Sequence, residues 1–243
     1  SMMKRGLGRG IESLFAMYDE EVEKTSPQPK KQTSEKAVDM VAIDKIKTNP
    51  NQPRKHFDEE ALNELAASIK IHGVIQPIVL NDNGDGTYLI IAGERRYRAS
   101  KIAGLKEVPA IIKNYTDKQI KEISIIENLQ REDLNPIEAA RAIKQLMEEY
   151  KLTQEAVAER IGKSRSNIAN TLRLLSLYPE VLDMIEKGSL SAGHARALVV
   201  VDDHMSQIKL ANQAVKDKWN VRDLERAVKR VQHPESKTRP KAD

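Results

Sequence analysis

Residues 152–177 read LTQEAVAERIGKSRSNIANTLRLLSL, and this stretch decides the fold of the second half of the chain. A short helix over residues 154–161 is expected to meet a turn at residues 162–164, after which a second helix runs to about Leu175. Apolar side chains recur where two such helices would bury each other, at Ala156, Val157, Ile161, Ile168, Leu172 and Leu175. The pattern predicts a helix-turn-helix.

The second helix of this pair is basic. From Arg160 through Arg173 the sequence holds four basic residues and no acidic one. In helix-turn-helix proteins the second helix enters the major groove, where Arg, Ser and Asn contact bases and phosphates. An ordinary helical hairpin with a solvated basic face is the alternative, but the short glycine turn and the lack of acids favour DNA. We expect DNA contacts from Lys163, Ser164, Arg165, Ser166, Asn167, Asn170, Thr171 and Arg173.

A further helix start follows in LSAGHARALVV, residues 190–200, with Ser191 as its expected cap. Gly193, His194 and Arg196 are candidates for a second contact to the same DNA. A lone histidine is more often structural, and none of the five histidines has the spacing of a metal site. Upstream, Asn135 is expected to cap a helix with Glu138 as its capping-box partner.

Toward the N-terminus the pattern alternates between strands and helices. Strands are expected at VDMVAIDKI (38–46), PIVL (77–80), TYLIIA (87–92) and VPAIIKNY (108–115). The turn NDNGDG predicts that the middle two form a hairpin. Helices are expected at residues 58–73, between an Asp58 cap and Gly73, and at residues 94–104.

The predicted fold class is therefore α+β, with a small N-terminal α/β domain and an all-helical domain that carries the helix-turn-helix. The expected divisions are a flexible tail at 1–36 with one short amphipathic piece, the α/β domain at 37–115, the helical domain at 116–232 and an unstructured end at 233–243. The helix-turn-helix falls at about 153–176.

Composition limits the function classes. Aromatic residues make up 4% of the chain and charged residues 31%, which is typical of a helix-rich protein with a large solvated surface. The net charge is only +4, so any nucleic-acid site must be a local concentration of basic residues. There is no cysteine, which excludes disulfides, thiol catalysis and thiolate metal sites. We expect a cytoplasmic, nucleoid-associated protein without a membrane segment.

A second basic segment, GERRYRAS at residues 93–100, lies where a strand turns into a helix. Such a junction offers free backbone N–H groups and the positive end of the helix dipole, and glycine lets the backbone approach an anion closely. Arginine adds donors suited to phosphate oxygens. The alternative is that these arginines pair with nearby acids such as Glu94 and Glu107.

Two polar stretches accompany this junction. In IIENLQREDLNPIEAA, Glu127 and Asn128 place a carboxylate beside a carboxamide, which are oxygen ligands of the kind that Mg²⁺ accepts when it bridges phosphates. A polar elbow between helices is the alternative. The other stretch, TNPNQPRKHF, carries Gln52 and Arg54 between stiffening prolines.

Taken in order, these segments resemble the ParB family of chromosome-partitioning proteins. The matching elements are NPNQPRKHF, GVIQPIVL, GERRYRA, IENLQREDLNPIEAA, GKSRSNIANTLRLL and GHARAL, which lie within residues 38–200. The resemblance implies a CTP-dependent clamp that loads at a palindromic DNA site, parS, closes around DNA and spreads. CTP hydrolysis resets the clamp.

The resemblance also implies roles for individual residues. Gly93, Glu94, Arg95 and Arg96 match the loop that holds the triphosphate, and Glu127 and Asn128 match the pair that coordinates Mg²⁺. The segment Gly73, Val74, Ile75 and Gln76 matches residues near the cytosine. Gln52 and Arg54 match further nucleotide contacts, with Gln52 and Glu94 the candidates for assisting hydrolysis.

The implied partners are parS DNA, a ParA-type ATPase, a condensin complex and a second copy of the chain, which gives a homodimer. KRGLGRGIESLF resembles the peptide that stimulates ParA, with Lys4, Arg5 and Arg9 as candidate contacts. A basic tail with nonspecific affinity is the alternative. After Val231 we find no match to the small C-terminal dimerisation domain of the family, and we expect it to be absent.

Three other interpretations remain open. A nucleoid-occlusion paralogue shares the clamp but carries a membrane-binding N-terminal helix; Arg165, Thr171 and Gly193 are of the parS-reading type instead. A transcriptional repressor without nucleotide chemistry leaves the GERR and ENLQRE segments unused. A sulfiredoxin-like phosphotransfer enzyme shares the N-terminal fold, but the lack of cysteine removes its usual chemistry.

Overall fold

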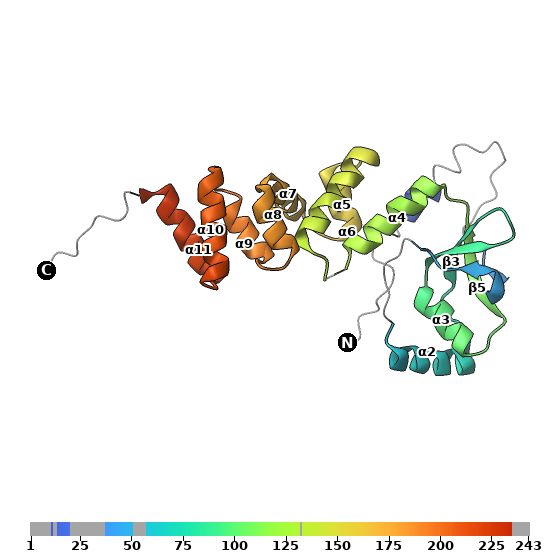
Figure 1. Ribbon diagram of the computed structural model, residues 1–243. Coiled ribbons are helices and arrows are strands. Elements are labelled where there is room, and N and C mark those ends of the chain that lie inside the picture. The colour runs from blue at the N-terminus through green and yellow to red at the C-terminus, as the bar shows by residue number, and fades with distance from the viewer. Residues whose placement is uncertain (1–10, 12–13, 20–36, 51–56, 132, 235–243) are drawn as a thin grey trace. The chain divides into compact units, whose positions relative to one another are not determined.

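The computed structural model describes residues 11, 14–19, 37–50, 57–131 and 133–234 (Figure 1). The chain forms two compact units, Ser1–Asn128 and Leu129–Asp243. In the described residues the first unit combines strands with helices, whereas the second contains helices and no strand. The predicted α+β class is confirmed.

A five-stranded sheet forms the centre of the first unit. Its strands are β1 (Asp39–Ala42), β2 (Ile46–Lys47), β3 (Ile78–Asp82), β4 (Tyr88–Ala92) and β5 (Glu107–Lys113), in the order β1-β5-β3-β4-β2. The predicted hairpin is confirmed as the antiparallel pair of β3 and β4, while β2 is parallel to β4 and β5 is parallel to β3.

The predicted strand at residues 38–46 is instead interrupted by a 3₁₀ turn, η1, at Ile43–Lys45. The turn separates β1 and β2, which lie at opposite ends of the strand order. Because only three residues join them, the sheet must curl until its two edges approach, as in a partly closed barrel. Apolar residues from all five strands, η1 and α3 fill its interior: Val41, Ile43, Ile46, Ile78, Leu80, Ile90, Tyr97, Val108 and Ala110.

Two helices pack against each other beside the sheet, α2 (Glu59–His72) and α3 (Glu94–Ile102). Leu62, Ala66 and Ile69 of α2 meet Ala99 of α3 in a buried cluster. As predicted, the Asp58 side chain caps α2 by accepting from two N–H groups, and Gly73 ends it with a φ of 72°.

The short amphipathic piece near the N-terminus is part of the first unit. Residues 14–19 are helical, and Leu14, Phe15 and Tyr18 are buried. The rings of Phe15 and Tyr18 lie 5.7 and 5.3 Å from that of Tyr115. Asp19 pairs with Lys113 at 2.7 Å and accepts from the Tyr115 hydroxyl. Burial, followed by the charge of Asp19, raises the pKa of Tyr115. The sequence had placed this piece in a flexible tail, whereas its apolar face is packed.

Helix α4 (Asp117–Leu129) also belongs to the first unit, which therefore ends later than the predicted boundary at residue 115. Two side-chain contacts hold it there. Asn49 donates to the Ser124 hydroxyl at 3.2 Å, and the Tyr18 hydroxyl donates to Glu122. Both contacts join segments far apart in the sequence, which explains why helical periodicity alone placed α4 in the helical domain.

The second unit is a succession of helices, drawn from yellow to red in Figure 1. They are α5 (Pro136–Glu149), α6 (Gln154–Ile161), α7 (Arg165–Arg173), α8 (Pro179–Glu186), α9 (Ala192–Leu198), α10 (His204–Lys216) and α11 (Val221–Gln232). Within the described part of the chain, none of the helices is both long and apolar enough to cross a membrane.

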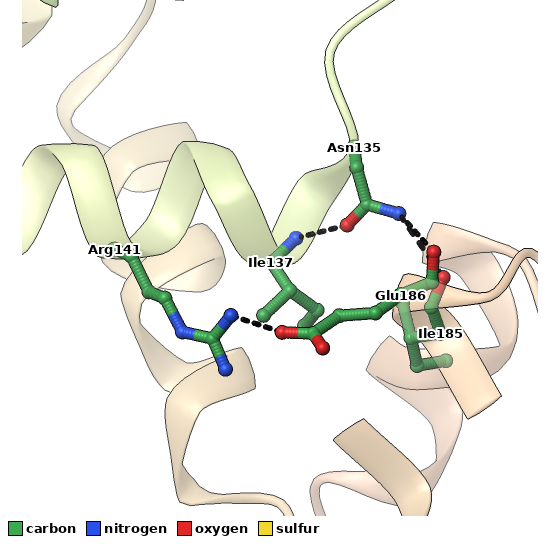
Figure 2. A network of polar contacts seen from close by, with 5 residues as sticks. All are labelled: Asn135, Ile137, Arg141, Ile185 and Glu186. Atoms are coloured by element: carbon green, nitrogen blue, oxygen red, sulfur yellow. Dashed lines mark hydrogen bonds and ion pairs between the residues drawn. The ribbon is translucent and has the colours of Figure 1, made fainter. Parts of the chain in front are cut away.

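The start of α5 shows how neighbouring helices are joined (Figure 2). The Asn135 side chain accepts from the N–H of Ile137, as predicted for a cap. Its amide group also donates to the carbonyls of Ile185 and Glu186 at the end of α8, at 3.1 and 3.3 Å. Arg141 pairs with the Glu186 carboxylate. This cap carries no capping box, the predicted role of Glu138; the Asn135 amide instead serves two helix ends.

Candidate DNA interface and nucleotide site

The helix-turn-helix has the predicted geometry. α6 spans the predicted residues, and Gly162 ends it in the left-handed conformation with a φ of 71°. Val157 and Ile168 are fully buried where α6 and α7 pack. α7 is shorter than predicted, because a 3₁₀ turn at Leu174–Ser176 follows Arg173 directly. The turn brings Leu174 into the core, where periodicity had placed Leu175.

The N-terminal half of α7 presents a polar, basic surface. The Ser164 hydroxyl caps the helix by accepting from the N–H of Asn167 at 3.0 Å. Arg165 pairs with Glu155 of α6 at 2.9 Å, although both side chains are more than half exposed. The Thr171 hydroxyl donates to the Asn167 carbonyl, which leaves it less available to DNA. The exposed candidates are Lys163, Ser164, Arg165, Ser166, Asn167, Asn170 and Arg173.

Two features of this surface were missed in the sequence. Arg160 counted toward the basic face, but it is 8% exposed and thus belongs to the interior of the second unit. Glu155 lies outside the acid-free window yet reaches Arg165 across the turn. Three exposed basic side chains therefore remain in this stretch, Lys163, Arg165 and Arg173.

The second proposed DNA contact, at the start of α9, contains residues with structural roles. His194 and Ser191 form a capping box, and the other ring nitrogen of His194 lies 2.7 Å from the Trp219 carbonyl. A Cβ on Gly193 would lie 2.8 Å from a methyl group of Val221. Both residues thus hold α9 against the start of α11. Arg196 is exposed, and a DNA contact from this helix stays a prediction.

The predicted phosphate loop lies at the junction of β4 and α3. Gly93 has a φ of 98° in the left-handed region, and no described side chain caps the first N–H groups of α3. A Cβ on Gly93 would lie 2.8 Å from Ile78 and 3.0 Å from the Arg96 guanidinium. The loop therefore requires glycine for its conformation and for the close approach of these neighbours. Open N–H groups at a helix N-terminus suit an anion.

Arg96 joins two of the predicted nucleotide segments. Its guanidinium donates to the carbonyls of Gln76 and Pro77 at 2.6 Å each. This contact ties the Gly73–Gln76 segment to the phosphate loop. Burial lowers the pKa of Arg96. The other two arginines differ: Arg98 pairs with Glu94 at 3.0 Å, one of the acids that the alternative named, and Arg95 is exposed.

Glu127 and Asn128, the predicted magnesium pair, occupy the last turn of α4 and are partly exposed. Their neighbouring carboxylate and carboxamide provide hard oxygen donors that fit Mg²⁺ when phosphates complete its coordination. Among the described residues there is no larger group of acids or histidines that could hold a metal ion by itself. Gln52, Arg54, Lys4, Arg5 and Arg9 lie outside the described residues, so their predicted roles remain predictions.

Comparison with known proteins covers both units. Residues 27–129 match the ParB N-terminal domain, and residues 132–233 match the ParB HTH domain. A chromosome-partitioning protein ParB of Myxococcus xanthus is 48% identical over 241 residues, which are 99% of this chain and 80% of that protein. A nucleoid occlusion protein of Lysinibacillus sphaericus is 48% identical over 202 residues, 83% of this chain and 67% of that protein.

A solved structure is similar in both sequence and backbone. It is a C-terminally truncated ParB from Caulobacter crescentus complexed to the centromeric parS site, 43% identical, with a TM-score of 0.64. The match covers 79% of this chain and 99% of that one. With its two domain matches and these relatives, the chain belongs to the ParB family of chromosome-partitioning proteins.

Proposed function

We propose that this chain binds a parS-type DNA site through α7 and acts as a CTP-gated clamp in chromosome segregation. The observation that carries the DNA-binding part is the exposed, basic start of α7. The similar ParB from Caulobacter crescentus was solved on the parS site, which supports the same target here. Arg165 would exchange its partner Glu155 for DNA at little cost, because a surface ion pair is worth less than about 1 kcal/mol.

The nucleotide part of the proposal rests on the phosphate loop. Backbone N–H groups after Gly93 would bind the triphosphate of CTP, and Arg96 would keep the Gly73–Gln76 segment in place beside it. Glu127 and Asn128 would hold Mg²⁺, which neutralises charge on phosphate oxygens. Glu94 and Gln52 would assist hydrolysis of CTP to CDP and phosphate.

Binding at this loop would also fix the orientation of α4. The helix carries Glu127 and Asn128 in its last turn and leads along the chain into the second unit. A nucleotide held by both the loop and α4 favours one arrangement of α4, which is how CTP would bias the clamp between open and closed states. A ParA-type ATPase, contacted by the N-terminal basic residues, a condensin complex and a second copy of the chain complete the proposed set of partners.

The first experiment tests DNA reading. Fluorescence anisotropy with a parS duplex and a scrambled duplex should show tighter binding to parS. Arg165→Ala, at the start of α7, should weaken parS binding by about tenfold or more, since a base or phosphate contact is worth about 1–3 kcal/mol. Lys209→Ala removes an exposed positive charge from α10 and is the matched control. Equal affinity for both duplexes would contradict the proposal.

The second experiment tests nucleotide turnover. Phosphate release is measured with CTP, ATP, GTP and UTP, each with parS, scrambled DNA or no DNA. We expect release from CTP alone, stimulation by parS and loss in Glu127→Gln. A chain that binds parS but neither binds nor hydrolyses CTP would be a transcriptional repressor, the alternative function for this fold.

A further inference from the structure

A second basic pocket lies in the first unit, away from the phosphate loop. It has a volume of about 390 Å³ and is lined by Ile46, Lys47, Thr48, Tyr97, Arg98 and Lys101. Ligand sites commonly occupy pockets of about 300–1,000 Å³. Three of the six lining residues are cationic, one is a threonine and none is acidic.

The pocket is built by the first unit's own core. Ile46 and Tyr97 are buried, and the Tyr97 hydroxyl donates to the Ile46 carbonyl at 3.4 Å, which joins β2 to α3 at its base. Lys101 lies with its ammonium 5.5 Å from the centre of the Tyr97 ring. Lys47 follows the buried Ile46 in β2, and its side chain is exposed. The cations are thus carried by a strand and a helix that are fixed to each other.

The charges in and around this pocket do not balance. Arg98 is paired with Glu94 and stacks over the Phe57 ring at 4.2 Å, so its position is fixed. Asp85 is an acid whose charge interacts with Lys47: hydrogen bonds from Thr87, with a smaller contribution from the charge of Lys47, lower the pKa of Asp85. Neither Lys47 nor Lys101 has an ion pair with a carboxylate among the described residues. An anion in the pocket would reduce the repulsion between these cations.

This pocket is distinct from the phosphate loop. Gly93 follows the carboxyl end of β4, whereas Lys47 pairs with Leu89 and Ile46 with Tyr88 at its beginning. α3 runs back along the sheet from Gly93, so Lys101, eight residues later, lies about 12 Å further along the helix axis. Arg98, which pairs with Glu94, lies between the two places, whereas Lys47 and Lys101 belong to the pocket alone.

From this arrangement we infer that the pocket between β2 and α3 is a second phosphate-binding site, with Lys47, Arg98 and Lys101 as cationic ligands and the Thr48 hydroxyl as a donor. Lysine and arginine together with a hydroxyl are the side chains that proteins most often present to phosphate oxygens. The phosphate would come from a small phosphorylated compound or from the DNA backbone. The inference does not depend on CTP binding at Gly93.

The test is a titration of the full chain with inorganic pyrophosphate, in which ¹⁵N–¹H NMR monitors the chemical shift of each backbone amide. We expect saturable shifts at the amides of Lys47, Thr48 and Lys101. The double variant Lys47→Gln/Lys101→Gln should lose them, with binding at the pocket weakened by more than about tenfold, because two charge-assisted hydrogen bonds to phosphate are removed. Lys70→Gln, an exposed lysine of α2, is the matched control and should keep them.

The outcomes separate this site from the proposed nucleotide loop. Shifts confined to the amides of residues 93–96 would overturn the second site while supporting the loop. Non-saturating shifts at lysines across the surface would overturn it as well. A scrambled duplex that reproduces the pocket shifts and competes with pyrophosphate identifies DNA as the phosphate source. Pyrophosphate shifts that the duplex leaves unchanged identify a small phosphorylated compound.

Discussion

Helices α3 and α7 are each nine residues long and rich in arginine, yet they use their charges differently. In α7 the N–H of Asn167 donates to the capping hydroxyl of Ser164, and Arg165 and Arg173 are exposed to solvent. In α3 no described side chain caps the N-terminus, while Arg96 turns back onto two backbone carbonyls. One helix thus exposes basic side chains, whereas the other leaves backbone N–H groups open at its start.

This difference explains why similar compositions suit different anions. Exposed, flexible cations around a capped helix start can follow the grooves and phosphates of a long polyanion. An uncapped start beside a partly buried cation suits one compact phosphate group, because its N–H donors are already in place. Arg96 supports that geometry by holding the neighbouring segment rather than by reaching outward.

The largest effect should come from Arg96→Ala. Removing the guanidinium leaves the carbonyls of Gln76 and Pro77 without their donor. We expect the free energy of unfolding to fall by about 3 kcal/mol, since each hydrogen bond from a charged group contributes about 1.5 kcal/mol or more. CTP binding should be lost with it. On α7, Arg173→Ala should change stability by less than about 0.5 kcal/mol, since its side chain is exposed. Urea denaturation of both variants measures these changes in the free energy of unfolding.

Arg95→Ala is the control on the same helix, because Arg95 is exposed and one position away from Arg96. It should unfold at nearly the wild-type urea concentration. If Arg95→Ala and Arg96→Ala were equally destabilising, the inward role assigned to Arg96 would be wrong.

A somewhat smaller effect is expected for Gly93→Ala. The alanine must keep the positive φ of Gly93, and its Cβ would lie 2.8 Å from Ile78. We therefore expect the free energy of unfolding to fall by about 2–3 kcal/mol. Gly104→Ala is the matched control: its φ is 78°, but nothing lies within 4 Å of the added Cβ. It should cost about 1 kcal/mol, the backbone strain alone. Thermal unfolding of the two variants measures the difference, which is the contribution of close packing around Gly93. Equal losses of stability in the two variants would show that close packing contributes nothing.

The two helices also differ in how far the sequence could predict them. The geometry of α7 depends on neighbours: Gly162, Ser164 and most apolar positions lie within one hairpin. Turn and cap rules therefore predicted the start of α7, although not the 3₁₀ turn that ends it after Arg173. The partners of Arg96 lie 19 and 20 residues away, and a pattern of charges does not indicate in which direction an arginine turns.

The same reason accounts for the segments that were predicted less well. The contacts of residues 14–19 with Lys113, Tyr115 and Glu122 join positions 94 to 104 residues apart, beyond the reach of any local period. Similarly, Asn49 contacts Ser124 across 75 residues, which places α4 with the sheet. Residues 38–46 were predicted as one continuous strand because the 3₁₀ turn at Ile43–Lys45 contains no glycine or proline that would indicate a break.

The next prediction concerns the side-chain cap that α7 has and α3 lacks. Ser164→Ala removes the acceptor for the Asn167 N–H and should destabilise the second unit by about 1 kcal/mol. Ser166→Ala, an exposed serine in the first turn with no cap bond, is the control and should be close to neutral. Urea midpoints of the two variants are compared. A loss in Ser166→Ala as large as in Ser164→Ala would show that the hydroxyl cap is not the cause.

The smallest effect should distinguish the surface ion pairs of the two helices. Arg98→Gln leaves Glu94, whose side chain is 15% exposed, without its partner, whereas Arg165→Gln leaves Glu155, which is 59% exposed. A carboxylate with little access to water is more costly to leave unpaired, so we expect about 1 kcal/mol for Arg98→Gln and about 0–0.5 kcal/mol for Arg165→Gln. Raising the salt concentration should widen the difference slightly, because the exposed Arg165–Glu155 pair is screened more than the Arg98–Glu94 pair. Urea denaturation of both variants at low and high salt measures this difference in the free energy of unfolding. An equal loss of stability in the two variants would mean that the Arg98 ion pair of α3 is no stronger than the Arg165 ion pair of α7.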